Sequence, residues 1–581
     1  MTSSRGSQLL YLVSCAFAFE SCLSAGAAPT RPAVTGPLNG PFFVQSYIGK
    51  CLTYGTLPAA APGPPLASGS PVTISDCVGT ASSRVVPQRV LQQIFVEEIN
   101  ESHEVVLHAG GKVIGIAGGF LAAQAPLELQ DYQPLSSAQT FQLDGDSIIL
   151  ARDRNLVVEV RNGRGANGTP LVLGNRDLDD TEFWTFATAD RVDRKPTRGF
   201  IRVPQDASFG AAVTGAKWGD VVEVDPTYQA AYPDLEPINV GPGVTIRGNR
   251  RFTLLGPEIS APNTTSQPDP MGMLVIGGND VRITGMRLRG PTRDKDATGL
   301  AANGIHRPNC DLEAHPGCDW RGLIIDHNDL SDWTVAGVNI DGSNGSRDCS
   351  VTGHPDPVTR QLDVRVVRNF IHDQRNNEGS GYGIVVGSGG FASIVGNTFL
   401  QNRHSIAGDG TALAGYGAWF NLVLSRATRY GCCYQQDFDM HGSRGGYGPP
   451  GGSDVEIARN TFLGTNRDNV WLRGAPCGAD RFSQNIVRSN SDTIKWFDNG
   501  GNGHNGPSFP TWLDVTADNS FGSGDPTQRL GVADFDGDGK DDLFLATGTA
   551  WYFAPAGAAE WRYLSAKAEG IDDLLFGDFD G

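Results

Sequence analysis

The sequence predicts an all-β protein made of three successive modules. Glycine supplies 75 and proline 35 of the 581 residues, while only 19% of residues are charged, and this composition favours turn-rich β structure over helices. Two kinds of internal repeat fill most of the chain, and each combines short β-branched or aromatic runs with turn residues. An aspartate-rich phrase, "ADFDGDGKDD", follows them near the end.

Residues 1–28 are typical of a secretory signal segment. Arg5 precedes a short apolar core, and small residues at 25–27 provide a cleavage site. An alternative is a lipoprotein cleavage site at Leu12-Val13-Ser14-Cys15. Either interpretation predicts a secreted or cell-surface protein. No other stretch approaches the ~20 apolar residues of a membrane-spanning helix, so we expect no integral membrane segment.

The charge and the cysteines narrow the class of protein further. A formal net charge of −18 argues against a nucleic-acid or anionic-membrane partner, because phosphate binding needs a basic surface. Eight cysteines follow residue 28, and an oxidising compartment favours disulfides over metal thiolates. We expect the pairs Cys51–Cys77 and Cys310–Cys318. The pairing of four cysteines stays open, namely Cys349, Cys432, Cys433 and Cys477.

The first module covers residues 38–190 and shows a threefold repeat. The phrases "LQQIFVEE", "AQTFQLDG" and "TEFWTFAT" place Phe95, Phe141 and Trp184 at separations of 46 and 43 residues. With its QxF phrases at 93–95 and 139–141, the module resembles the ricin B-type lectin β-trefoil. The resemblance implies a β-trefoil fold.

The same resemblance implies sites for sugars. An early Asp in each repeat of that family accepts hydrogen bonds from sugar hydroxyls, and the matching positions here are Thr53, Gly115 and Glu159. Only the third repeat keeps a carboxylate, so Glu159 and Asn175 are the candidate glycan-binding residues. The alternative is a trefoil kept as a structural spacer.

The second module, residues 198–520, predicts a right-handed parallel β-helix. A strand–Asn–apolar phrase returns at irregular spacing, and a glycine-bounded strand follows each copy. We expect the asparagines to stack into a ladder that satisfies turn backbone, and residues 208–224 to cap the first coil. The repeated asparagines are Asn328, Asn369, Asn397, Asn460 and Asn485.

This module resembles secreted pectate-lyase-like β-helix proteins. The segment "GLIIDHNDLSD" at 322–332 is similar to the "WIDH" segment of pectate lyases. The RxPxxR motif that carries their catalytic arginine is absent from the module, which departs from the family's pattern. That absence argues against classical pectate lyase activity.

Six glycine-bounded strands can be stacked in one column, and they bring charged residues together. The strands are "VNIDG", "IVVG", "SIAGD", "FDMHG", "VWLRG" and "IKWFD". Stacked in this way, Asp439 lies beside Trp471 and Lys495, while His441 lies beside Gly408 and Arg473. Because stacked strands are ~4.8 Å apart and side chains alternate faces, these groups are expected to share one outer groove.

The predicted groove would bind an acidic polysaccharide. Arg473 and Lys495 would counter the uronate carboxylate, Trp471 would stack on a sugar, and His441 or Asp439 would remove a proton. A hydrolase variant pairs Asp439 with Asp437 or Asp409 as acid and base. His404 and the pair His372-Asp373 would extend the site. The alternative is a structural hydrogen-bond network at a turn.

The third module, residues 525–581, contains the predicted calcium loop. Carboxylates at positions 1, 3, 5 and 9 of a glycine-containing turn can aim oxygens at one point, and hard Ca²⁺ prefers oxygen ligands. These residues resemble FG-GAP/VCBS calcium-loop repeats of β-propellers, and "FGDFDG" begins a second copy 44 residues later. Because a single blade cannot bury both faces, we expect the natural chain to continue beyond Gly581. The predicted ligand set is Asp534, Asp536, Asp538, Lys540 and Asp542.

Two hypotheses follow for the whole chain. The first is a secreted carbohydrate-binding protein that is also a candidate polysaccharide lyase or glycoside hydrolase, with Ca²⁺ as its cofactor. The second is a non-enzymatic adhesion or structural protein of the cell surface. The mixed-sign set around Asp439 favours the first hypothesis, and the missing lyase arginine motif favours the second.

Overall fold

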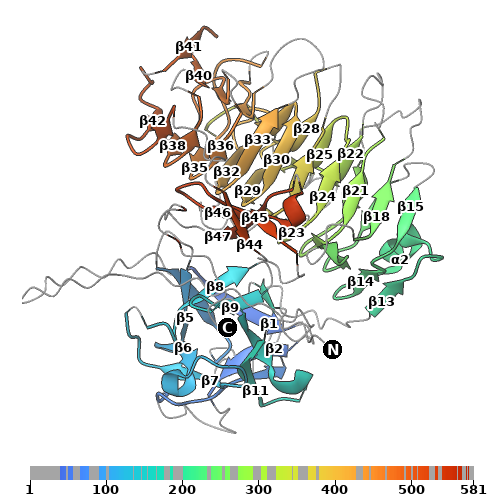
Figure 1. Ribbon diagram of the computed structural model, residues 1–581, viewed down its shortest axis with the longest axis vertical. Helices are drawn as coiled ribbons and strands as arrows, with labels where there is room; N and C mark the ends of the chain where they lie inside the picture. The colour runs from blue at the N-terminus through green and yellow to red at the C-terminus, as the bar shows by residue number, and fades with distance from the viewer. Residues whose placement is uncertain are drawn as a thin grey trace, which may run out of the picture. The chain divides into compact units, whose positions relative to one another are not determined.

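The computed structural model forms two compact units, one holding the strands from β1 to β12 and the other those from β13 onward. It describes residues 39–574 with gaps (Figure 1). Outside the description lie 1–38, 47–49, 56–65, 77–90, 100–103, 135, 145–146, 154, 165, 176–183, 188–199, 232–236, 251–255, 262–271, 292–301, 310–321, 343–344, 351–363, 375–378, 427–435, 444–445, 465–467, 490–492, 499–500, 507, 523–529, 534–539, 559, 566–570, 572–573 and 575–581.

The unit of residues 39–187 is a 12-stranded antiparallel sheet that closes around one apolar core, as expected for a β-trefoil. Trp184 is buried there, and its indole nitrogen donates to the carbonyl of Val158 at 2.8 Å. The strands are β1 (Asn39–Ser46), β2 (Lys50–Tyr54), β3 (Val72–Asp76), β4 (Ile94–Glu98), β5 (Glu104–Ala109), β6 (Lys112–Ile116), β7 (Leu127–Gln130), β8 (Phe141–Asp144), β9 (Ser147–Leu150), β10 (Leu156–Val160), β11 (Thr169–Asn175) and β12 (Trp184–Ala187), with the 3-10 turns η1 (Ala117–Gly119) and η2 (Arg161–Gly163).

The repeated aromatic residues of this unit lie in the core in two of the three repeats, but not in the first. Phe141 and Trp184 lie in the core, as the repeat predicts. In the first repeat the core positions are instead Ile94 and Val96, and Phe95 between them is half-buried. Side chains alternate faces along a strand, so the two aliphatic neighbours turn Phe95 away from the core.

The unit beginning at β13 contains a parallel β-helix of three sheets, visible as stacked arrows in Figure 1. The first sheet is β13 (Phe200–Val203), β14 (Val221–Val224), β17 (Thr245–Arg247), β20 (Arg282–Thr284), β23 (Leu323–Asp326), β26 (Val364–Val367), β29 (Phe391–Val395), β32 (Gly415–Trp419), β35 (Val455–Ala458), β38 (Asp480–Ser483) and β42 (Leu513–Val515). The second is β15 (Gln229–Ala231), β18 (Glu258–Ser260), β21 (Arg287–Arg289), β24 (Asp329–Ser331), β27 (Phe370–His372), β30 (Thr398–Asn402), β33 (Leu422–Arg426), β36 (Thr461–Phe462), β39 (Ile486–Val487) and β43 (Ser520–Phe521).

The third sheet carries the predicted site. Its strands are β16 (Ile238–Val240), β19 (Gly272–Ile276), β22 (Asn303–Arg307), β25 (Ala336–Asp341), β28 (Tyr382–Gly387), β31 (His404–Gly408), β34 (Phe438–Met440), β37 (Val470–Leu472), β40 (Ile494–Phe497) and the antiparallel β41 (Gly503–Asn505). One apolar core fills the interior between the three sheets. Successive coils therefore present equivalent positions one above another on the outside.

An asparagine ladder lines the corner between the first and second sheets, as predicted. Each buried asparagine donates its amide to a carbonyl of a lower coil, and its Oδ1 accepts a backbone N–H from the preceding ladder residue. The residue before most of them has a left-handed φ, such as 55° at His327 and 54° at Phe420. Such a φ costs ~1 kcal/mol for a non-glycine residue, and the ladder bonds offset that cost. The structure adds Asn421 and Asn519 to the five predicted members.

A short helix covers the first coil within the segment 208–224 that was expected to form a cap, whereas Val221–Val224 of that segment form strand β14 of the first sheet. α2 (Phe209–Gly215) starts after Ser208, whose hydroxyl accepts the backbone N–H of Ala211 at 3.2 Å. Phe209 and Val213 project from α2 into the apolar core of the β-helix. The helix thus closes an end that would otherwise expose apolar interior and strand edges.

A four-stranded antiparallel sheet follows the β-helix and packs against it. Tyr552, Leu545 and Tyr563 share an apolar cluster with Phe420 and Leu422 of the β-helix. The hydroxyl of Tyr552 donates to the carbonyl of Phe420 at 2.7 Å. One face of this sheet is therefore buried against the β-helix. The strands are β44 (Leu530–Ala533), β45 (Asp542–Ala546), β46 (Trp551–Ala554) and β47 (Arg562–Ser565), with the turn η7 (Pro555–Gly557).

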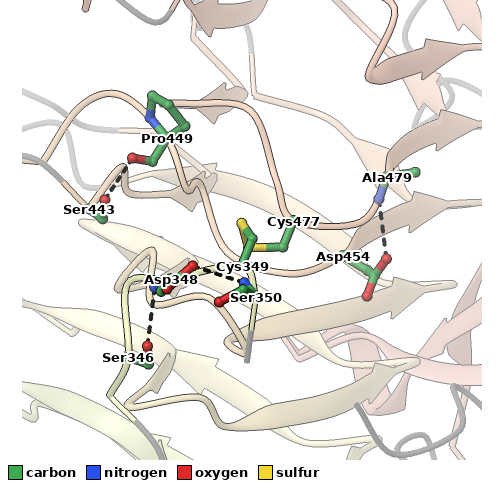
Figure 2. Close-up of a disulfide and its surroundings, with 9 residues drawn as sticks. All are labelled: Ser346, Asp348, Cys349, Ser350, Ser443, Pro449, Asp454, Cys477 and Ala479. Carbon is green, nitrogen blue, oxygen red and sulfur yellow. Dashed lines mark hydrogen bonds between the residues drawn. A yellow bond between two sulfur atoms is a disulfide. The ribbon is translucent and has the colours of Figure 1, made fainter. Parts of the chain in front are cut away.

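One disulfide links two loops of the third sheet that are far apart in sequence. Cys349, in the loop after β25, bonds to Cys477, in the loop after β37, across 128 residues of chain (Figure 2). Three strands, β28, β31 and β34, lie between those two. The backbone N–H of Ala412 donates to the carbonyl of Ser346 at 2.8 Å, which ties the loop to an intermediate coil. Residues 345–350 thus extend past the carboxyl ends of these strands.

Several other predictions fall partly or wholly outside the described residues. Cys51 is disulfide-bonded, but Cys77 lies outside the description, as do Cys310, Cys318, Cys432 and Cys433. The signal segment 1–28 also lies outside it.

The search for membrane spans covered the described residues. None of the helices there has the length and apolar character needed to cross a bilayer.

Candidate functional site

The third sheet brings the predicted strands together in the predicted column. Asp439 pairs with Trp471, and Trp471 pairs with Lys495, which confirms that row. One strand was misplaced by a residue: Gly408 pairs with Met440, so His441 follows in register beside Asp409 rather than beside Gly408. Phe438 and Met440 point into the core, so Asp439 between them projects to the outer side.

Asp439 is nevertheless buried, with 0% exposure, so it does not line an open groove. Arg473 binds both of its oxygens, with Nε donating to Oδ1 at 2.9 Å and Nη2 donating to Oδ2 at 2.5 Å. Burial alone would raise the pKa of Asp439, but the adjacent His441 and Arg473 hold that pKa well below its usual range. Asp439 is thus a fixed anion rather than a proton acceptor, which corrects its predicted catalytic role.

Arg473 is committed to Asp439 and to aromatic rings. Its guanidinium carbon lies 5.3 Å from the ring centre of Tyr447 and 5.2 Å from that of Trp471, and the residue is buried. The chelated carboxylate neutralises its charge. Arg473 is therefore not available to counter a substrate carboxylate, contrary to the prediction.

His441 is the accessible member of the predicted acid–base set. Its side chain is 29% exposed, and its Nε2 lies 3.0 Å from Oδ2 of Asp439. At this distance the imidazole and the buried carboxylate interact directly. A buried carboxylate at one ring nitrogen favours a proton there and leaves the opposite ring nitrogen as the basic one.

Lys495 is the cation that stays uncommitted at this surface. Its Nζ lies 4.4 Å from the ring centre of Trp471 and 5.2 Å from that of Phe497. Among the described residues, no carboxylate forms an ion pair with it. Trp471 is itself buried, with the two cations near its ring, so it does not offer the predicted open surface for sugar stacking.

The remaining predicted residues of this site have structural partners. His404 is fully buried, its Nδ1 lies 2.8 Å from the carbonyl of Gln436, and burial lowers its pKa to about 3. Asp409 accepts the backbone N–H groups of Ser388 at 2.8 Å and Thr411 at 2.9 Å. Asp437 is buried and accepts the side-chain amide of Asn469 at 2.5 Å. None of the three is therefore a free acid or base on an open surface.

His372 and Asp373 lie on a different face. His372 is in the second sheet, where its Nδ1 lies 2.8 Å from Asp373 and its Nε2 lies 3.0 Å from Asp329. This pair belongs to a network of charges that also includes Arg250. It does not extend the site around His441.

Asp341 was missed by the sequence interpretation although its strand was in the column. Gly387 lies beside it in register, and a Cβ at Gly387 would lie 2.9 Å from Oδ1 of Asp341 and 3.2 Å from Oδ2 of Asp409. The two carboxylates therefore face each other across a glycine. His306, whose Nε2 lies 3.1 Å from Oδ2 of Asp341, is the other missed residue. The phrase "GIHR" has the same pattern as the stacked strands and would have revealed it.

Of the three positions matched to the lectin carboxylate, Glu159 is the one that carries an acid. Its Oε1 accepts the side-chain amide of Gln124 at 3.3 Å, and Gly174 makes room beside its carboxylate. Thr53 is instead buried and accepts a hydrogen bond from Gln92. At Gly115 an added Cβ would lie 2.2 Å from Oε1 of Gln130.

Asn175 does not share a face with Glu159. Glu159 pairs with Val172 in β11, and Asn175 lies three residues further along that strand. Because side chains alternate faces along a strand, a separation of three residues places the two side chains on opposite faces. Asn175 is exposed at the strand end, so the structure does not bring the predicted pair together.

The calcium loop is described only at its end. Asp534, Asp536 and Asp538 lie outside the described residues. Lys540 is exposed, whereas Asp542 is fully buried and its Oδ1 accepts the backbone N–H of Ala556 at 2.8 Å. Among the described residues, no group of three His, Cys, Asp or Glu side chains is arranged to hold a metal.

Comparisons with known proteins give a partial likeness. No family model matches this chain, and no curated protein matches it. Among solved structures, the designed threefold-symmetric protein ThreeFoil is 15% identical over 25% of this chain and 96% of its own, with a TM-score of 0.21. The C-half of the earthworm R-type lectin, solved with GalNAc, is 17% identical over 25% of this chain and 96% of its own, with a TM-score of 0.19. The Rhizoctonia solani agglutinin is 18% identical over 28% and 99%, also with a TM-score of 0.19.

Proposed function

We propose that this protein is a secreted carbohydrate-binding protein whose β-helix binds an anionic polysaccharide at β37 and β40. The observation that supports this most directly is Lys495, a half-buried ammonium held against Trp471 and Phe497 without an acidic partner among the described residues. An unmatched cation beside aromatic rings fits a ligand that carries both carboxylates and apolar sugar faces. Uronic-acid polymers have that chemistry.

The stacked coils support a polymer rather than a small ligand. Neighbouring strands repeat every ~4.8 Å, so the outer side of the third sheet offers polar groups in extended rows. These groups lie in two neighbouring rows: Asp341, Asp409 and His441 follow one another in the first, and His306 and Lys495 lie in the second. A chain of sugar units can contact several coils at once, which adds affinity without a deep pocket.

A binding measurement tests this proposal. Polygalacturonate and alginate, with neutral dextran as reference, are titrated into the full-length protein and into Lys495→Gln. We expect at least a tenfold loss of affinity for the acidic polymers in the variant, and a wild-type affinity that falls with added salt. Lys217→Gln, at an exposed lysine after α2, is the matched control and should bind like the wild type. Equal binding by Lys495→Gln would contradict the proposal.

A second candidate function, β-elimination, is favoured by His441. A base that abstracts a proton must be accessible and oriented, and His441 is partly exposed with its Nε2 turned to Asp439. In such a step the imidazole takes the proton from C5 of a uronate, the C–H electrons form the C4–C5 double bond, and the C4–O bond breaks. Solvent protonates the departing oxygen. Lys495 would stabilise the carboxylate as charge develops at C5.

The ultraviolet absorbance of the unsaturated product tests this step separately. Digests of polygalacturonate, alginate and glycosaminoglycans that develop the absorbance in the wild type but not in His441→Gln support elimination. A flat trace with every acidic polymer that binds removes it and leaves a binding protein. Reducing ends that appear without the absorbance indicate hydrolysis instead. Absence of binding to all polymers favours the alternative of an adhesion or structural protein.

A further inference from the structure

The outer side of the third sheet carries opposite charges at two separate places. Val338 and Ile340 of β25 point into the core, so Asp341 next to them projects outward. Ile494 of β40 also points into the core, and Lys495 therefore projects outward in the same way. β28, β31, β34 and β37 lie between β25 and β40 in the sheet. Five steps of ~4.8 Å thus separate Asp341 from Lys495 by ~24 Å along the stack.

Two carboxylates, Asp341 and Asp409, make the first of these places an acidic region. A Cβ at Gly387 would lie 2.9 Å from Oδ1 of Asp341 and 3.2 Å from Oδ2 of Asp409, so both oxygens lie beside the space that this glycine leaves open. Nε2 of His306 lies 3.1 Å from the other oxygen of Asp341, whose side chain is 23% exposed. Asp409 accepts backbone N–H groups and, among the described residues, forms no ion pair. One imidazole therefore faces two carboxylates, which leaves this region negative.

The second place is positive. Arg473 and Asp439 neutralise each other through two hydrogen bonds. His441 lies 3.0 Å from the same carboxylate. Lys495 lies against Trp471 and, in the described part of the chain, forms no ion pair with a carboxylate. The ammonium of Lys495 is therefore the excess charge at this end.

A polymer that lies across both places meets both charges. The Debye length is ~8 Å at physiological ionic strength, so charges ~24 Å apart act on different sugar units. An anionic unit is attracted to Lys495, whereas an anionic unit above Asp341 and Asp409 would be repelled. A neutral unit there would not be repelled, and its hydroxyls can donate to the two oxygens beside Gly387.

We infer that the bound polymer carries its carboxylates on spaced units, with neutral hydroxyl-bearing units between them, rather than on every unit. This rests on the proposed function, because it requires Lys495 to hold an anionic unit. A homopolymer of uronate satisfies Lys495 only while its other units lie over the acidic region. A mixed polymer of uronate and neutral sugar fits both places at once. The arrangement of charges on the sheet thus selects among acidic polysaccharides.

Affinities for two polymers of matched length, measured in EGTA, test this selectivity. Hyaluronan alternates a uronate with a neutral N-acetylhexosamine, whereas polygalacturonate carries a uronate at every unit. We expect the full-length protein to bind hyaluronan more tightly. Asp341→Asn should raise the affinity for polygalacturonate about threefold, the size of one like-charge contact at a partly exposed site, and Asp341→Lys should raise it further. Asp341→Asn should not raise the affinity for hyaluronan.

The matched control is Asp514→Asn on the first sheet. It removes the same negative charge from the chain at a side chain that is 68% exposed. Both affinities should stay at their wild-type values in this variant, which separates a local effect of Asp341 from an effect of net charge. Thermal unfolding of each variant shows whether the fold is retained.

Three results would overturn the inference. One is tighter wild-type binding of polygalacturonate than of hyaluronan. Another is an unchanged polygalacturonate affinity in both Asp341→Asn and Asp341→Lys, which would show that the polymer does not reach the acidic region. The third is a polygalacturonate affinity that rises on addition of Ca²⁺ in the wild type but not in Asp341→Asn, because the carboxylates would then hold a bridging cation.

Lys495→Gln separates this inference from the proposed function. Weaker binding of both polymers by Lys495→Gln, together with any of those three results, would keep the proposed function and remove the spacing of the carboxylates. Wild-type binding by Lys495→Gln would remove both.

Discussion

Arg250 contacts Glu560 across the junction between the β-helix and the four-stranded sheet. Both residues are buried, and Nη2 of Arg250 also lies 3.4 Å from Oδ2 of Asp329. Nε of Arg562 donates to the other oxygen of Glu560 at 3.0 Å. One guanidinium thus links a carboxylate of the sheet to a carboxylate of the β-helix, and the two elements are expected to unfold together.

Removing one charge of this pair should destabilise the whole unit. Glu560→Gln leaves the positive charge of Arg250 buried with one neutralising carboxylate fewer. Breaking a buried ion pair costs ~3–5 kcal/mol. Urea unfolding, followed by tryptophan fluorescence, measures the loss. The matched control is Asp514→Asn, whose partner Arg481 lies 3.9 Å away at an exposed site, and it should cost ~0.5 kcal/mol or less. Equal midpoints for both variants would show that the junction contributes little.

The buried His404 predicts a loss of stability in mild acid. Burial lowers its pKa in the folded protein to about 3, while an unfolded histidine has a pKa of ~6.5. Between these values the unfolded chain binds a proton that the folded chain does not, so stability falls as pH decreases from ~6.5. The slope for one proton is ~1.4 kcal/mol per pH unit.

Urea unfolding from pH 7 to pH 4 isolates this contribution. We expect His404→Gln to flatten the pH dependence of the unfolding free energy by about one proton's slope. His504→Gln, which removes an exposed histidine, is measured alongside as the comparison variant. A wild-type slope in His404→Gln would mean that the imidazole is protonated inside the fold.

The stacked strands were predictable because the pattern that encodes them is short and repeated. An apolar–polar alternation followed by glycine identifies each strand of the third sheet, and Asn identifies each corner. The one misplaced strand has a physical cause. Gly408 occupies an interior position, where Met440 of the next coil fills the space that a side chain would take. A glycine is not recognised as an apolar position of the alternating pattern. The strand was therefore aligned with its neighbours one residue out of register.

The state of the charged residues could not be predicted in the same way. The alternation of apolar and polar residues predicts that the side chain of Asp439 points out of the core. Only the three-dimensional structure shows that Arg473 binds both of its oxygens and that both residues are buried. Asn421 was missed for a different reason. It follows Phe420, a bulky residue in the left-handed conformation that turn patterns assign to glycine or small polar residues. Both cases depend on neighbours from other coils.

Substitutions in the middle of the asparagine ladder should destabilise the fold more than substitutions at its end. Asn421 donates to the carbonyl of Ile394 at 2.8 Å, and its Oδ1 accepts the backbone N–H of Asn397 at 2.9 Å. Asn421→Ala leaves both backbone groups buried without partners, at a cost of ~1–3 kcal/mol each. Asn519→Ala, at the half-buried end of the ladder, should cost less. Thermal unfolding of both variants measures the order, and an equal loss would argue against a continuous ladder.

Calcium is expected to stabilise the four-stranded sheet through the loop before β45. One carboxylate oxygen of Asp542 accepts the backbone N–H of Ala556. Asp542 and the earlier aspartates of the loop carry the negative charge that a hard cation would neutralise. At a calcium concentration 100-fold above the dissociation constant, binding to the folded state adds ~2.7 kcal/mol. The melting temperature should therefore fall on addition of EGTA and recover with excess Ca²⁺. Asp534→Asn should remove the response, while Asp514→Asn keeps it, and a melting curve indifferent to EGTA would show that this loop holds no calcium.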